Sequence, residues 1–124
     1  MSLTDAVRTV LSKYATFQGR AVRSEFWFFV LFVFLLFTVL AFIEGAVLAP
    51  ALGFSAFDRD AGQPLSLIAS LALLLPNIAV AVRRLHDIDR SGWWLLIGFV
   101  PVLGFLVLLY WYIQPGTDGA NQYG

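Results

Sequence analysis

The chain has 124 residues, of which 60% are hydrophobic and only 13% are charged, and its formal net charge is zero. Soluble domains carry about a quarter charged residues, so this composition excludes an ordinary soluble domain and indicates a membrane protein. The zero net charge gives nucleic-acid binding no electrostatic support. The absence of cysteine excludes disulfides and thiolate metal sites. The length allows one small domain, residues 1–124, and no linker or internal repeat divides it.

Residues 3–14 have the spacing of an amphipathic helix. Apolar residues recur there at three- and four-residue steps, with charged and polar residues between them: Leu3, Val7, Val10, Leu11 and Tyr14. Ser2, three residues before Asp5, is typical of a helix N-cap. At about 1.5 Å per residue the segment is too short and too polar to cross lipid. We therefore expect a helix that lies in the membrane interface.

A first membrane span is expected at residues 26–48. An apolar run extends from Phe26 to Ile43 with Thr38 as its only polar member, and a bilayer core needs about 20 such residues. The run is longer than the apolar region of a signal peptide and no cleavage site follows it, which favours a permanent span. Glu44 would lie about 13 Å from the midplane. That depth favours an interfacial carboxylate, and an ion or proton path is the alternative.

A second span is expected at residues 65–82, after a loop of turn-forming residues between Pro50 and Pro64. Pro76 lies inside this span and lacks an amide donor, so it predicts a kink. The adjacent Asn77 has to satisfy its side-chain amide in a dry environment. We interpret it as the source of an interhelical hydrogen bond, with substrate binding as the alternative.

Residues 93–113 form a third apolar segment with aromatic residues at both ends. Aromatic belts at both ends are typical of a full span, which is the arrangement we favour. Pro101 and Gly104 near the middle leave a second arrangement open, a re-entrant hairpin that returns both ends to one face. Residues 114–124 are expected to form a loop or an extended tail. The predicted fold is all-α: an integral membrane helical bundle with three apolar spans and an N-terminal interfacial helix.

The basic residues predict the orientation of the chain. Arg59 lies alone in the first loop, and the other seven precede the first span or follow the second: Arg8, Lys13, Arg20, Arg23, Arg83, Arg84 and Arg90. Basic residues concentrate in cytoplasmic loops, so the N-terminus is expected in the cytoplasm. With three full spans the tail lies outside, and with a hairpin it returns to the cytoplasm.

Three polar motifs occur along the chain. Residues 17–27 read FQGRAVRSEFW, residues 83–94 read RRLHDIDRSGWW and residues 115–124 read PGTDGANQYG. In these motifs and over nearly its whole length, the sequence resembles the YhaH/YhaI-like family of bacterial inner-membrane proteins, domain of unknown function 805. That family commonly has a basic residue where this chain has Gln122. The resemblance implies a multi-pass protein of the bacterial inner (cytoplasmic) membrane, and it implies no activity.

The first two motifs supply the candidate functional side chains. These are Arg20, Arg23, Glu25, Arg83, Arg84, His86, Asp87, Asp89 and Arg90. If the second span continues as a helix, Asp87 lies three or four residues from Arg83, Arg84 and Arg90, which predicts a salt-bridged turn. The functional interpretation is a binding site for anionic lipid head groups or a partner membrane protein, because guanidinium groups suit phosphate.

Catalysis has weaker support. His86 is the only histidine, and Asp87 or Asp89 could orient it as a general base. His86, Asp89 and Glu25 are candidate ligands of a metal site. No nucleophile elbow or phosphate loop accompanies these residues, so we expect no catalytic residue, no metal and no cofactor. The predicted function is a non-enzymatic membrane module that binds lipid, a partner protein or a second copy of itself. An oligomeric transporter or channel that uses Glu44 and Asn77 is the alternative.

Overall fold

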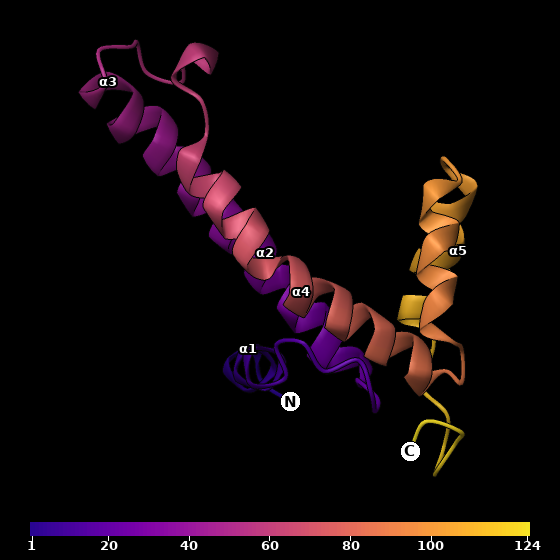
Figure 1. Cartoon of the computed structure of the whole chain (residues 1–124). Helices are drawn as coiled ribbons and strands as arrows, with labels where there is room; N and C mark the ends of the chain where they lie inside the picture. The colour runs from indigo at the N-terminus through magenta and orange to yellow at the C-terminus, as the bar shows by residue number, and fades with distance from the viewer. The chain divides into compact units, whose positions relative to one another are not determined.

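The computed structural model describes all residues, 1–124, and consists of helices and loops without strands (Figure 1). The helical elements are α1 (Leu3–Ser12), α2 (Arg23–Ile43), the π-helix η1 (Glu44–Leu48), α3 (Ala49–Ala51), the 3-10 helix η2 (Arg59–Ala61), α4 (Pro64–Asp87), the 3-10 helix η3 (Gly92–Phe99) and α5 (Leu103–Ile113). The all-α class is confirmed. The chain forms two compact units, residues 1–30 with 75–124, and residues 31–74.

Two helical stretches are long and apolar enough to cross a membrane. One covers 29 residues, Arg23–Ala51, through α2, η1 and α3, and the other is the 24-residue α4. At 1.5 Å per residue these extend about 43 Å and 36 Å, more than the roughly 30 Å of a hydrocarbon core. In their most apolar windows only 11% and 17% of the residues are buried. Core helices of soluble proteins are mostly buried, so this exposure favours lipid as the surroundings.

Residues 93–113 do not form the continuous helix that a full span requires. They divide into η3 and the 11-residue α5, which is about 16 Å long and half of what a bilayer core needs. The break follows from Pro101, which has no amide hydrogen to continue a helix. Val102 then takes a left-handed φ of 64°, which is rare for a β-branched residue. The structure therefore has a helical hairpin here, and its re-entrant placement in the membrane stays a prediction.

Gly104 allows the two arms of this hairpin to meet. A Cβ atom at position 104 would lie 1.7 Å from the carbonyl oxygen of Ile97. The backbone of α5 therefore approaches the backbone of η3 more closely than any other residue type permits. Because the arms are antiparallel neighbours, both ends of the hairpin lie next to the end of α4.

The unit made of residues 1–30 and 75–124 has a mixed interior. Its buried apolar side chains come from α1, the start of α2, the end of α4 and α5, and include Val10, Phe29, Val80, Leu85 and Leu108. Ser2 caps α1, because its hydroxyl oxygen accepts from the Asp5 amide at 3.1 Å. Five charged or titratable side chains are buried alongside these apolar ones: Glu25, Arg83, Arg84, His86 and Asp87.

Candidate functional site

Arg84 joins the end of α4 to two other segments of the chain. Its side chain is fully buried. Nη1 donates to the Asp87 carboxylate at 2.6 Å and to the Ala21 carbonyl at 3.2 Å. Nε donates to the Tyr112 carbonyl at 3.2 Å, and Nη2 donates to the Gln114 carbonyl. One guanidinium group thus fixes the segment before α2 and the end of α5 against α4.

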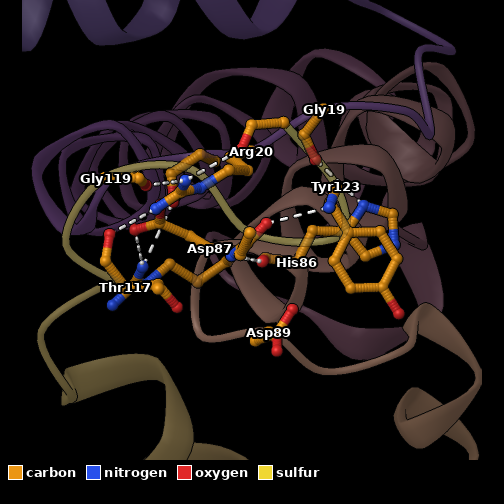
Figure 2. A network of polar contacts seen from close by, with 12 residues as sticks. Gly19, Arg20, His86, Asp87, Asp89, Thr117, Gly119 and Tyr123 are labelled. Carbon is orange, nitrogen blue, oxygen red and sulfur yellow. Dashed lines mark hydrogen bonds and ion pairs between the residues drawn. The ribbon is translucent and has the colours of Figure 1, made fainter.

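Asp87 is shared between two arginines. Its Oδ2 pairs with Arg84, and its Oδ1 accepts from Arg20 Nε at 2.8 Å. Figure 2 shows Arg20 between Asp87 and the C-terminal tail, where it donates to the carbonyls of Thr117 and Gly119, both at 2.6 Å. The Asp87 backbone carbonyl in turn accepts from the Thr117 amide at 2.7 Å. Asp87 therefore holds the tail directly, through its backbone carbonyl, and indirectly, through the bond of its carboxylate to Arg20.

His86 is held on three sides. Its Nδ1 lies 2.9 Å from the Gly19 carbonyl oxygen, and because a carbonyl only accepts, Nδ1 carries the hydrogen. The ring stacks on Tyr123, with centroids 3.9 Å apart and planes 2° from parallel (Figure 2). The backbone carbonyl of His86 accepts from Asn121 Nδ2 at 2.9 Å. Neither neighbouring aspartate bonds to the ring, so no His-Asp general-base pair is formed.

The three residues considered as metal ligands have separate partners. Glu25 pairs with Arg83 at 2.7 Å, His86 bonds to Gly19, and Asp89 Oδ1 lies 3.4 Å from the Gln122 amide. No group of three histidine or acidic residues is arranged to hold a metal ion.

Two of the three predicted ion pairs of Asp87 are wrong. Arg83 pairs with Glu25 of α2, because both oxygens of Asp87 are taken by Arg20 and Arg84. Arg90 stacks over the Trp111 ring, 4.8 Å from its centroid. Since α4 ends at Asp87, the helical spacing that would bring Arg90 back to it is lost. The predicted Arg84–Asp87 pair is formed.

Arg83 remains incompletely satisfied. It has no exposed side-chain surface, and its Nε and Nη2 atoms have no hydrogen-bond partner. Its backbone carbonyl accepts from the Ala21 amide at 2.9 Å. Glu25 is therefore the only group that compensates the buried positive charge of Arg83.

Arg23 differs from Arg20, Arg83 and Arg84 because its side chain is exposed. It makes one hydrogen bond, from Nη1 to the Ile113 carbonyl at 3.2 Å. Together with Arg20, Ser24, Asp87 and the start of the tail it lines a cavity of about 510 Å³. Its remaining donors are available to a ligand in that cavity.

The two polar residues predicted within or at the edge of the membrane spans behave differently. Glu44 is buried, and its carboxylate accepts from the amides of Leu65 at 2.9 Å and Ser66 at 3.3 Å and from the Ser66 hydroxyl. It therefore caps the free amides of the first turn of α4, where the helix dipole favours a negative charge. Asn77 is half-buried, and the interhelical hydrogen bond expected of it is not formed within the chain.

Sequence reasoning missed the contribution of the tail. The acceptors that saturate Arg20 and Arg84 are backbone carbonyls, at Ala21, Tyr112, Gln114, Thr117 and Gly119, and any residue type carries a carbonyl. The available signal was Gly116, where a Cβ atom would lie 2.0 Å from Asp87 Oδ2. No feature of the sequence distinguishes Tyr123, which stacks on His86, from an exposed tyrosine.

Residues 14–124 match the family described as protein of unknown function DUF805. The chain belongs to this family. It is 41% identical over 119 residues to the inner membrane protein YhaI of Escherichia coli strain K12, covering 94% of this chain and 89% of that protein. Identity to the inner membrane protein YhaH of the same strain is also 41%, over 116 residues, 93% of this chain and 89% of the relative. The chain is therefore a bacterial inner-membrane protein.

A third relative is more distant. The uncharacterized protein YiiR of the same strain is 32% identical over 103 residues, which cover 82% of this chain and 60% of that protein. No solved structure matches the chain.

Proposed function

We propose that the chain is a non-enzymatic, multi-pass membrane module that binds anionic phospholipid head groups at its cytoplasmic face. The contacts of the cluster support a structural role for most of its charges. Asp87, Arg84 and Glu25 are buried and paired, and His86 lacks an orienting carboxylate. What the cluster does is fasten the tail and the hairpin to the end of α4.

The proposed threading has both termini in the cytoplasm. Residues 23–51 cross outward and α4 crosses back, since both are long and apolar enough, and the hairpin of η3 and α5 re-enters without crossing. Charge supports this orientation. Residues 1–30 with 75–124 carry seven basic and five acidic side chains, a net charge of +2, whereas residues 31–74 carry one basic and three acidic side chains, a net charge of −2. Cytoplasmic segments are the more basic ones.

The observation that carries the lipid-binding proposal is the exposed Arg23 in the cavity beside the tail. Arg83 and Arg84 were among the arginines proposed to bind head groups. Both are closed to solvent, so neither can contact a head group directly. The guanidinium group of Arg23 makes one hydrogen bond, to a carbonyl. Its other N–H groups are available to donate to a phosphate. Ser24 lines the same cavity and adds a hydroxyl. The net positive charge of this unit attracts anionic lipid.

The test is a titration of detergent-purified protein with short-chain phosphatidylglycerol and phosphatidylcholine, read as thermal stabilisation. We expect phosphatidylglycerol to stabilise the protein more, and Arg23→Gln to weaken its apparent affinity about tenfold, because one charge-assisted hydrogen bond is lost. Arg59→Gln is the matched control, since Arg59 is exposed in the other loop, and its affinity should equal that of the wild type. Equal stabilisation by the two lipids, or an unchanged affinity in Arg23→Gln, contradicts the proposal.

A further inference from the structure

A second cavity, of about 460 Å³, lies between the end of α4 and η3. Ile78, Val82 and His86 form its α4 wall, and Trp93, Leu95 and Leu96 form the η3 wall. Its volume falls within the roughly 300–1,000 Å³ of small-molecule sites. Gly92 sets the close approach of the two elements, because a Cβ atom there would lie 2.6 Å from Val82 Cγ1.

His86 supplies an unused acceptor to this cavity. The side chain is only 8% exposed, its Nδ1 is committed to the Gly19 carbonyl and one face is covered by Tyr123. In the neutral ring with hydrogen on Nδ1, the Nε2 atom is an acceptor, and it has no partner within the chain. The buried side-chain atoms without a partner belong to Arg83 alone, so Nε2 is accessible, and a hydroxyl group of a ligand can donate to it.

Ser91 adds a second polar group to the lining. Its hydroxyl oxygen accepts from the Trp93 amide at 3.3 Å, which leaves the hydroxyl hydrogen free to donate. The cavity therefore presents one acceptor, on His86, and one donor, on Ser91, and its other walls are almost entirely apolar.

The lining changes in character along α4. Ile78, Val82 and His86 are spaced four residues apart, so they follow one face of the helix over about 12 Å. The His86 end adjoins the charged cluster, and the Ile78 end lies two turns further into the apolar part of α4. The cavity is thus polar at the end near the charged turn and apolar at the other end. A phospholipid has the same arrangement, with a polar head group and apolar acyl chains.

We propose that this cavity binds one acyl chain of a phosphatidylglycerol molecule, whose glycerol head group donates a hydrogen bond to His86 Nε2. A choline head group has no hydrogen-bond donor, so the acceptor on His86 discriminates against it. The site shares no lining residue with the cavity at Arg23, and it does not depend on the function proposed above.

The position of the bound acyl chain is tested with phosphatidylglycerol that carries a photoreactive diazirine in that acyl chain. After illumination in detergent micelles, we expect the cross-links to concentrate on residues 78–96. Leu95→Trp fills the cavity and should reduce these cross-links at least fivefold. Leu109→Trp is the matched control on α5, outside the lining, and should leave them unchanged. Cross-links spread evenly over the apolar surface, or equal in both variants, overturn the proposal.

The head-group contact is tested by His86→Asn, in which the amide nitrogen replaces Nδ1 toward Gly19 and nothing replaces Nε2. We measure phospholipid retained per protein after detergent washing, with equal amounts of phosphatidylglycerol and phosphatidylcholine supplied. In an Arg23→Gln background, the protein with His86 should retain about fivefold more phosphatidylglycerol than phosphatidylcholine. The additional substitution His86→Asn should abolish this preference. The background removes the head-group contact proposed at Arg23, so the two proposals fail independently. Equal retention of both lipids with His86 present contradicts the inference.

Discussion

At the scale of single residues, the cluster depends on Asp87. The Asp87 side chain is only 7% exposed, and its carboxylate faces the guanidinium groups of Arg20 and Arg84. The backbone carbonyl of Asp87 binds the tail. Desolvation makes a buried ion pair a modest source of stability while both partners are present. Removal of one partner is different, because it leaves a charged group buried without compensation.

We therefore predict that Asp87→Asn destabilises the protein by about 3–5 kcal/mol, since Arg84 stays buried and loses its only ionic partner. The measurement is equilibrium unfolding in mixed detergent micelles, followed by tryptophan fluorescence. Asp89→Asn is the control, because Asp89 is exposed and makes one long hydrogen bond, and it should change stability by less than about 0.5 kcal/mol. Similar effects of the two substitutions would show that the cluster does not depend on Asp87.

Sequence spacing predicts residue contacts only within one element. The Arg84–Asp87 pair was predicted because three residues separate its members on a helix, and it is formed. The Arg83–Glu25 and Arg20–Asp87 pairs join residues 58 and 67 positions apart. Three positively charged groups and two carboxylates allow several pairings, and only tertiary packing selects one of them.

At the scale of elements, the hairpin of η3 and α5 determines where the tail begins. Hydrophobic composition alone could not separate this hairpin from a full span, because both place the same apolar side chains in lipid. The relevant signals were Pro101 and Gly104, of which the first ends a helix and the second permits a close backbone contact. By contrast, the long apolar runs around α2 and α4 predicted their helices well, because an uninterrupted run leaves few alternatives.

Gly104→Ala is predicted to destabilise the hairpin by about 2 kcal/mol or more, because the new methyl group meets the Ile97 backbone carbonyl, which cannot move aside cheaply. Gly98→Ala is a matched substitution in the facing arm. Its methyl group would approach only the end of the Leu108 side chain, at 3.3 Å, and should have a smaller effect. The same unfolding assay compares the two variants, and an equal loss in both would argue against a close backbone contact at Gly104.

At the scale of the whole molecule, the central claim is that the chain crosses the membrane twice and that its polar motifs share the cytoplasmic side. The family and the composition indicate an inner-membrane protein. The side that we propose for the tail is supported instead by the hairpin and by the hydrogen bonds that Arg20 and Arg84 make to residues 114–124. A tail on the opposite side of the membrane could not make any of these bonds.

The most direct test is a pair of reporter fusions placed after Gly124 in the full chain, expressed in bacterial cells. One reporter is a fluorescent protein that matures only in the cytoplasm, and the other is an alkaline phosphatase that is active only outside the inner membrane. If the polar motifs and the tail share the cytoplasmic side, the fluorescent-protein fusion will be fluorescent and the alkaline phosphatase fusion will be inactive. An active phosphatase with a dark fluorescent protein would place the tail outside, would require a third crossing, and would contradict the account.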